Sequence, residues 1–486
     1  MSLLILVGCE EQVLEPNLKG QIAQDELLQT KQGFLLALNG AYEPLNSGAL
    51  YDLGLVQPLA KMSDDGWTWR KETEEQTYNY TPTKSEVSNW WEAHYQGIVR
   101  ANTILSRLAE TDVVSGSVKT TLEGQTKFLR GLYYFNLVRI YGGVPLITDE
   151  VTSREEAEQS RATVENVYNQ IKTDLSDAIN LLPASYGGSS DFNVGMATQG
   201  AAKTLKAKVH LELREWSDAA TLAQEVINSG EYELHDDYIT NFYGNAENGI
   251  ESVFEIQFSS ESGAVGANWN FWAPQEFQGG SGVLPTDANN DFGVSTTTPD
   301  GIVQAFEAGD ERMSVALDTY GLPNFLDPNK PVGSLYHINK YFDGNEFPPG
   351  QSPFNFPLFR YSEVLLIAAE ALNEQGANNS NAIMYVDMVR NRAGLQDLEA
   401  SVTSDQDAFR QAIRQERRVE LCFEGKRYFD LNRWATLQET IAKTGVDIAA
   451  DKFISHPITG QPYHLYPIPA TEFINNANLG DQNPGY

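Results

Sequence analysis

The segment QERRVELCFEGKRYFDLNRW, residues 415–434, carries acidic side chains whose spacing could support catalysis. Glu416, Glu420 and Glu424 recur every four residues, so in a helix they would share one face. A glycosidase needs two carboxyl groups about 5–10 Å apart on either side of the bond that it cleaves. This face could supply such a pair, which makes the segment the first candidate active site.

Arginines interleaved with these acids argue against that role. Opposite charges stand three residues apart, a spacing at which they pair on a helix, at Arg417–Glu420, Glu424–Arg427 and Asp430–Arg433. Such partners keep carboxylates ionised, whereas a general acid needs a raised pKa. We therefore predict that the segment forms a structural ion-pair network joining the last helices.

Other catalytic and metal-binding patterns are missing from the sequence. The six histidines form no HExxH pair, and neither a GxSxG elbow nor a GxxxxGK loop occurs. The segment TDANNDFG (286–293) has oxygen-bearing side chains at alternating positions, as a calcium loop begins. Phe292 stands where an EF-hand needs glycine, and Thr298 where it needs glutamate. We expect no catalytic residue and no metal site, with calcium binding left open.

Four tryptophans lie outside helical patterns, next to short polar side chains. The segments DDGWTWR and NWNFWAPQEF place them among Asp64, Asp65, Trp67, Trp69 and Arg70, and among Asn268, Trp269, Asn270, Trp272 and Gln275. An indole ring stacks on the C–H face of a sugar, while carboxylate, amide and guanidinium groups bond its hydroxyls. These residues are candidate sugar ligands. The alternative is that the rings pin long loops onto the scaffold.

Helical periodicity dominates the rest of the chain. Apolar stripes of 3.6-residue period predict helices at 25–45, 85–109, 121–141, 163–182, 198–213, 216–228, 361–375, 380–393, 405–424 and 427–442. Several lie in pairs with short connections, which is typical of TPR-like hairpins that stack to bury their apolar faces. Trp90, Trp91, Trp216 and Trp434 fall within these patterns and are expected in the core. We predict a mainly α fold built from TPR-like helix hairpins.

Two irregular stretches interrupt the helices. Residues 230–358 are rich in Gly, Asn, Asp, Pro and Ser, with brief strand-like pieces such as SVFEIQF (252–258), and residues 46–84 form a second stretch. Over a hundred residues of this kind are too long for a simple linker. Loops held on a rigid scaffold commonly carry binding sites, so we expect the ligand here.

Composition limits the partners of the chain. Its 486 residues contain 66 acidic and 34 basic side chains, a formal net charge of −32. Such a surface repels phosphate backbones, and no local basic patch offsets it, which argues against nucleic-acid binding. No apolar run approaches the ~20 residues that a membrane-spanning helix needs.

The N-terminal segment has its own chemistry. LVGC at residues 6–9 resembles a bacterial lipobox, in which the cysteine is acylated, and several acyl chains together anchor a protein firmly. The apolar run before Cys9 lacks a basic start, so we expect the true start to lie upstream. We predict a signal-peptide remnant at 1–8 and a tether at 9–24. Cys422 is expected to be a buried hydrophobic residue, the alternative being a disulfide with Cys9.

Seven segments together resemble the SusD/RagB family of surface glycan-binding lipoproteins of Bacteroidetes. In the family's order they are WEAHYQGIVRANTIL (91–105), FLRGLYYFNLVRIYGGVPLITD (128–149), SRATVENVYNQIKTDLSDAINLLP (160–183), GAAKTLKAKVHLELREWSDAATLAQEVINSGEYEL (200–234), LFRYSEVLLIAAEALNEQG (358–376), IRQERRVELCFEGKRYFDLNRW (413–434) and YPIPATEFINNANLGDQNPGY (466–486). Glu10 and Glu11 resemble the acidic signal that directs such lipoproteins to the cell surface.

The resemblance implies one SusD-like α/α superhelical domain at residues 25–486. We expect a helical scaffold at 25–229 and 359–442, a ligand-binding region at 230–358 and a C-terminal segment at 443–486. By analogy with the family, ligand contacts come from residues 64–70 and 268–275, with Tyr320 and Tyr341 added, and segment 415–434 is scaffold.

The resemblance also implies a function without catalysis or cofactor. The protein would capture an oligosaccharide or polysaccharide at the outer-membrane surface, held there only by lipid on Cys9, and pass it to a SusC-like TonB-dependent transporter. Loop tryptophans on an acidic protein suggest a neutral glucan, for example a β-glucan such as laminarin. The alternatives are a secreted glycoside hydrolase and a TPR-type scaffold for protein interactions.

Overall fold

The structure is a computed structural model. It describes residues 24–68, 74–187, 189, 191–242, 246–261, 266–267, 292–293, 301–319, 321, 329–333, 336–341, 352–376 and 379–486, with backbone alone for 24–25, 67–68 and 292–293.

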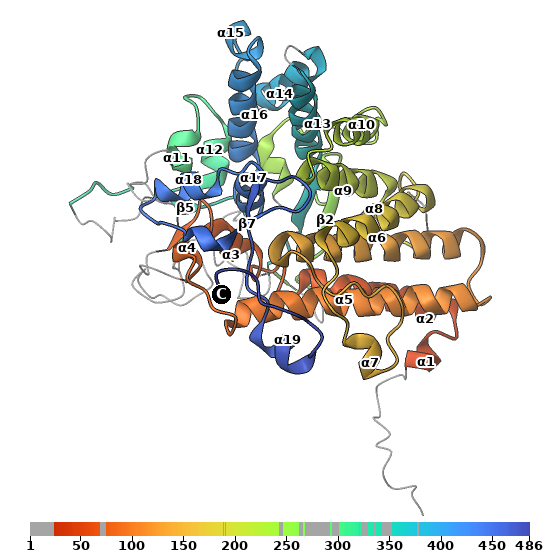
Figure 1. Cartoon of the computed structure of the whole chain (residues 1–486). Coiled ribbons are helices and arrows are strands. Elements are labelled where there is room, and N and C mark those ends of the chain that lie inside the picture. The colour runs from red at the N-terminus through yellow and green to blue at the C-terminus, as the bar shows by residue number, and fades with distance from the viewer. Residues whose placement is uncertain are drawn as a thin grey trace, which may run out of the picture.

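The first half of the chain is helical (Figure 1). Its α-helices are α1 (Gln24–Leu27), α2 (Lys31–Tyr42), α3 (Val56–Lys61), α4 (Glu74–Thr77), α5 (Ser85–Glu110), α6 (Gly116–Tyr141), α7 (Arg154–Ala157), α8 (Val164–Leu181), α9 (Gln199–Glu212) and α10 (Trp216–Ile227). Short polar side chains begin several of them: the side-chain oxygens of Thr30, Thr163 and Thr198 each accept a hydrogen bond from a backbone N–H of the first turn.

The second half returns to helices after a region of short strands. Its helices are α11 (Ile302–Ala305), α12 (Arg312–Ala316), α13 (Tyr361–Gln375), α14 (Ser380–Arg392), α15 (Ala400–Thr403), α16 (Gln406–Glu420), α17 (Arg427–Arg433), α18 (Leu437–Ala442) and α19 (Ala470–Asn475).

Four two-stranded antiparallel sheets lie between or beside the helices. They pair β1 (Trp67–Thr68) with β3 (Phe292–Gly293), β2 (Ser252–Ile256) with β6 (Phe356–Arg360), β4 (Leu317–Asp318) with β5 (His337–Ile338), and β7 (Phe453–Ser455) with β8 (Pro462–His464). The predicted strand piece at 252–258 is confirmed by β2. The β1–β3 and β2–β6 sheets join segments far apart in the sequence, whereas β4 and β5 both lie within the stretch 230–358.

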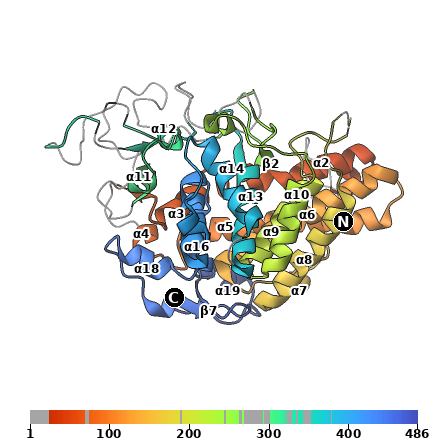
Figure 2. The same ribbon diagram turned by 90° about the horizontal axis from the view of Figure 1, so that it is seen from above.

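The long helices pack side by side in the order α5, α6, α8, α9, α10 and α13, with α14 and α16 packed on α13. Figure 2 shows these helices as a curved layer, with α12 on one side of the molecule and α19 on the other. The mainly α, TPR-like prediction is confirmed. No helix in the described parts of the chain combines the length and the apolar character needed to cross a bilayer.

The core lies around α6, which is buried along almost its whole length from Phe128 to Tyr141. Trp90, Trp91 and Trp434 are buried as predicted, and Trp216 is half-buried. The C-terminal segment returns to the first half of the chain, where Tyr466 stacks on Tyr80 with ring centroids 4.3 Å apart. Cys422 is also buried, as predicted.

Three predicted helices are shorter than expected or divided. The helix predicted over 25–45 is divided into α1 and α2, with residues 28–30 in a turn between them, and α2 ends at Tyr42. The helix predicted over 405–424 ends at Glu420, because the chain turns through left-handed backbone at Phe423 and Gly425, with φ of 61° and 69°. The helix predicted over 427–442 breaks after Arg433, where Ala435 has φ of 61°. Glu424 therefore lies beyond the helix face that carries Glu416 and Glu420.

Candidate functional site

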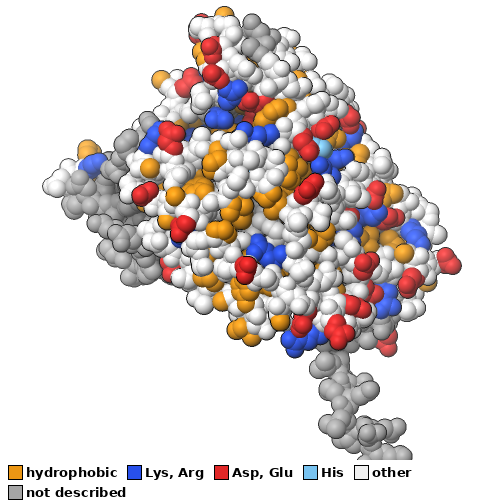
Figure 3. Space-filling view, in the orientation of Figure 1, with side chains coloured by type: hydrophobic (Ala, Val, Ile, Leu, Met, Phe, Trp, Pro, Cys, Tyr) orange, Lys and Arg blue, Asp and Glu red, His pale blue; other side chains and the backbone are white. Residues whose placement is uncertain are grey.

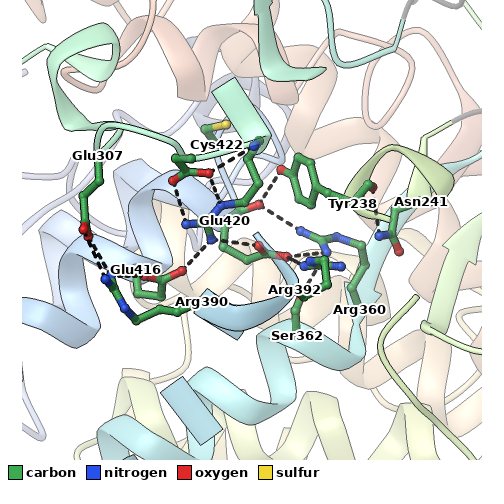
Figure 4. A network of polar contacts seen from close by, with 12 residues as sticks. Tyr238, Asn241, Glu307, Arg360, Ser362, Arg390, Arg392, Glu416, Glu420 and Cys422 are labelled. Carbon is green, nitrogen blue, oxygen red and sulfur yellow. Dashed lines mark hydrogen bonds and ion pairs between the residues drawn. The ribbon is translucent and has the colours of Figure 1, made fainter. Parts of the chain in front are cut away.

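The acids of segment 415–434 lie inside the protein, each paired with basic side chains. Three of these acids are linked to one another through shared basic partners, and we call this group the ion-pair network. Its members are Glu251, Arg312, Lys340, Arg360, Arg390, Arg392, Glu416, Glu420 and Glu424. Figure 4 shows part of this network, with side chains from several elements directed toward Glu420.

Glu420 sits at the centre of the network and contacts three guanidinium groups. Its carboxylate oxygens lie 2.7 Å from Arg360, 2.6 Å from Arg392 and 3.1 Å from Arg312. Burial alone would raise the pKa of Glu420, but the three arginines outweigh burial and hold that pKa far below its ordinary value. A carboxylate in this state cannot donate a proton as a general acid.

The network prediction is confirmed, but most of its pairs differ from those expected. Asp430 and Arg433 do pair, at 2.8 Å. Arg417 contacts Asp430 at 3.0 Å, and Glu424 contacts Arg360 at 2.7 Å. The difference arises because α16 ends at Glu420, so the acids reach partners on other elements. The sequence prediction missed Arg312, Lys340 and Arg360, which have no local spacing to the acids.

The first irregular stretch, 46–84, is attached to the scaffold by two carboxylates. Asp64 accepts two hydrogen bonds from Arg427, both 2.8 Å long, and lies 3.0 Å from Arg418. Asp65 lies 2.7 Å from Arg418. Burial opposes ionisation of Asp64, yet the hydrogen bonds and charge of Arg427, together with Arg418, lower its pKa.

The second irregular stretch, 230–358, is held at the same end of α16. Arg312 at the start of α12 contacts Glu416 at 2.5 Å. The Lys340 ammonium lies 2.6 Å from Glu424 and donates to the Cys422 carbonyl at 2.8 Å. Both irregular stretches are therefore connected to α16 and the turn that follows it, through buried charges.

The two stretches meet in one small sheet. Strand β1 follows directly after Asp64, Asp65 and Gly66, and it pairs antiparallel with β3, so that Trp67 stands opposite Gly293 and Thr68 opposite Phe292. A Cβ on Gly66 would lie 2.5 Å from the Ala60 carbonyl oxygen, so this turn fits closely against α3 only as glycine. The candidate ligand site is the region where β1 and β3 meet.

The placement of the predicted ligand residues is mixed. Trp67 lies in β1, with its backbone alone described. Trp69, Arg70, Asn268, Trp269, Asn270, Trp272, Gln275, Tyr320 and Cys9 lie outside the described residues, as do residues 286–291 of the calcium-like segment. Their roles stay predictions.

Three predicted ligand residues are placed where a sugar does not reach them, which corrects that part of the prediction. The carboxylates of Asp64 and Asp65 are buried against arginines, because the turn is closed onto α16 and α17. Tyr341 is 2% exposed, and its hydroxyl donates to the Phe423 carbonyl at 3.3 Å. These residues position the loops instead.

Among the described residues, one group could hold a metal ion: His210, Glu215 and Asp218, at the turn between α9 and α10. Glu215 already contacts His210, and its other oxygen lies 3.1 Å from the Lys172 ammonium. Glu215 is thus already bonded to two neighbours, one of them on α8, and we assign no metal here.

Comparison with known proteins decides the family. The model of the SusD family matches residues 318–486, and a model described as starch-binding associating with outer membrane matches residues 22–211. SusD-like protein P2 of Formosa agariphila is 30% identical over 517 residues, covering 100% of this chain and 98% of that protein. This chain belongs to the SusD/RagB family.

Solved structures of the same fold agree. A SusD homolog from Bacteroides thetaiotaomicron superposes with a TM-score of 0.78 at 24% identity, covering 96% of this chain and 99% of the other. A laminarin-binding SusD-like protein gives a TM-score of 0.73 at 25% identity, covering 94% and 99%. The SusD-like fold predicted from the sequence is thus confirmed.

Proposed function

We propose that this SusD-family protein is a non-catalytic, lipid-anchored glycan-binding protein of the cell surface. It captures an oligosaccharide or polysaccharide and passes it to a SusC-like TonB-dependent transporter. One observation carries the proposal beyond family membership: the irregular stretches 46–84 and 230–358, whose sequences contain the candidate tryptophans, pair with each other at β1 and β3, and buried charges attach both stretches to one scaffold.

The absence of a catalytic role is supported by the state of the acids. Glu416, Glu420 and Glu424 could have formed a carboxylate pair, yet each is buried and bonded to basic side chains. Their partners belong to the loop attachment rather than to an open cleft. The charged segment thus supports ligand binding by positioning loops.

A neutral glucan is the favoured ligand class. The formal net charge of −32 disfavours anionic polysaccharides, and flat indole rings suit the C–H faces of neutral sugars. A β-glucan such as laminarin is the specific proposal, supported by the laminarin-binding SusD-like protein of the same fold. Candidate contacts are Trp67, Trp69, Arg70, Asn268, Trp269, Asn270, Trp272, Gln275 and Tyr320.

Membrane attachment is proposed through acylation of Cys9. The lipobox-like LVGC and the following Glu10 and Glu11 support it, and residues 9–24 are the proposed tether between lipid and domain. Metabolic labelling with a fatty-acid probe, compared between the native chain and Cys9→Ala, tests this step.

A carbohydrate array tests the function as a whole. The protein lacking residues 1–9 is applied to neutral, amino and acidic glycans, and the supernatant is assayed for released reducing sugar. We expect retention on neutral glucans with no release. Retention on none of the neutral glycans, or release of reducing sugar from a bound one, would overturn the proposal.

A further inference from the structure

A cavity of about 770 Å³ lies between α5, α7 and α19, at the lower edge of Figure 1 and away from α11 and α12. Its size falls within the roughly 300–1,000 Å³ of small-molecule sites. Figure 3 shows hydrophobic side chains exposed over α19 at this edge. None of the loop residues assigned above to the glycan site lines it.

One face of α5 supplies an aromatic and apolar wall. Trp91, Tyr95 and Val99 recur every four residues, and all three line the cavity. Tyr95 is half-buried and Val99 is 46% exposed, so both surfaces are accessible. The rings of Trp91 and Tyr95 lie with centroids 5.0 Å apart, and the Tyr95 hydroxyl donates to the Pro145 carbonyl at 2.7 Å, which fixes the wall.

The opposite wall is held in place by contacts between α7 and α19. Arg154 donates to the Asn475 carbonyl at 3.3 Å, Asn476 donates to the Gln159 carbonyl at 2.7 Å, and Asn478 donates to the Glu158 carbonyl at 2.7 Å. Because both walls are fixed, a ligand would enter without the cost of ordering the cavity.

The charged side chains around the apolar wall are mostly acidic. The charged side chains lining the cavity are Glu92, Glu158 and Glu472 against Arg154 alone, and Arg154 is itself paired with Glu158. Glu472 accepts a hydrogen bond from the Trp91 indole; partial burial first, and then the charge of Glu92, outweigh that bond and raise the pKa of Glu472. An anion would be repelled here, whereas hydroxyls or an ammonium group would find acceptors.

We propose that this cavity is a second carbohydrate-binding site, separate from the loop site, which takes a neutral or amino sugar and rejects an acidic one. The sugar's C–H face contacts Tyr95 and Val99, and its hydroxyls bond the carboxylates of Glu92 and Glu472 and the amide of Gln96. Two sites on different faces would let one chain hold two segments of a polysaccharide, which strengthens retention by effective concentration.

The test measures binding of three monosaccharide probes by saturation-transfer NMR. The probes are methyl β-D-glucopyranoside, D-glucosamine and D-glucuronate. The full chain carries Trp67→Ala and Trp69→Ala, which weakens the proposed loop site by removing two of its aromatic contacts. Val99→Arg is then added, because a guanidinium at this position fills the cavity and pairs with its acids. Val113→Arg is the matched control, since Val113 is 47% exposed and does not line the cavity.

We expect the glucoside and glucosamine to bind saturably and glucuronate not to bind. Val99→Arg should weaken binding by at least about fivefold, a loss of roughly 1 kcal/mol, while Val113→Arg leaves it unchanged. Equal binding by the two arginine variants, no binding of any probe, or binding of glucuronate as strong as that of the glucoside would each overturn the proposal. These outcomes can be interpreted even if the array shows no retention, because the NMR test uses monosaccharides and compares two variants, only one of which changes the cavity.

Discussion

At the scale of single residues, Arg360 shows how buried charge is used in this protein. Its guanidinium is 1% exposed and contacts Glu251 at 2.8 Å, Glu420 at 2.7 Å and Glu424 at 2.7 Å. Removing Arg360 leaves three buried carboxylates with fewer compensating positive charges, because only Arg312, Arg392 and Lys340 then remain beside them. The acids that resemble a catalytic pair in the sequence are therefore structural because of what surrounds them.

Replacing Arg360 by Met should reduce the free energy of unfolding by about 3–5 kcal/mol, because three carboxylates lose a common partner. Urea unfolding of native and variant protein measures the change, and Arg360→Lys gives an intermediate case if the Met variant does not fold. The control is Arg154→Met, whose side chain is 79% exposed and pairs on the surface, where about 0–1 kcal/mol is expected. Equal losses at both positions would show that the buried network is not a special determinant of stability.

At the scale of elements, the turn between α3 and β1 joins the scaffold to the proposed ligand site. Asp64 and Asp65 attach it to α16 and α17, and Gly66 lies against the α3 backbone. The backbone of β1 is therefore positioned by contacts that residues 64–66 make just before it. Small changes in this turn should move the β1–β3 pair.

Gly66→Val tests that idea, because its Cβ would lie 2.5 Å from the Ala60 carbonyl oxygen and force the turn to shift. We expect glucan affinity to fall and stability to drop by about 1–3 kcal/mol, as for overpacked sites. Gly48→Val is the matched control in the same irregular stretch, since nothing lies within 4 Å of a Cβ there. Affinity is measured by affinity electrophoresis. Unchanged glucan affinity in Gly66→Val would show that the position of this turn does not determine ligand binding.

The helices were predictable from the sequence because their signals are local. Apolar stripes mark α5, α8 and α9 within one or two residues of their observed bounds. The turns after Glu420 and after Arg433 were not predictable, since Phe423 in the first and Ala435 in the second adopt left-handed backbone without being glycine. Nor was the attachment of the loops, because Asp64 and Arg427 are 363 positions apart and no local spacing relates them.

At the scale of the whole molecule, pH acts through many buried groups. Burial alone would raise the pKa of Glu363, but its basic neighbours outweigh burial and lower that pKa to about 2. The pKa values of Glu370 and Glu424 are lowered for the same reason. Burial lowers the pKa of His464 to about 3, where its ring nitrogens contact Tyr80 and Tyr428. Burial raises the pKa of Glu212, Glu255 and Glu416, which act in the opposite direction.

The signs of the lowered groups predict loss of stability in acid. Below about pH 6.5 the unfolded chain protonates His464 while the folded chain does not, and below about pH 4.5 the same holds for Glu363. The free energy of unfolding should therefore fall as pH is lowered from about 6.5 toward 2, most steeply below about 4.5. Urea titrations at several pH values check this. A flat or rising profile over that window would mean that the raised carboxyls dominate.

The central proposal for the whole molecule is that one helical scaffold presents two loops whose indole rings hold a neutral glucan. Isothermal titration with laminarin, comparing native protein with Trp67→Ala/Trp69→Ala, tests it most directly. Two lost stacking contacts of about 0.5–1.5 kcal/mol each predict a decrease in affinity on the order of tenfold, with unchanged urea stability. Laminarin affinity equal to that of the native protein in a folded double variant would contradict the account.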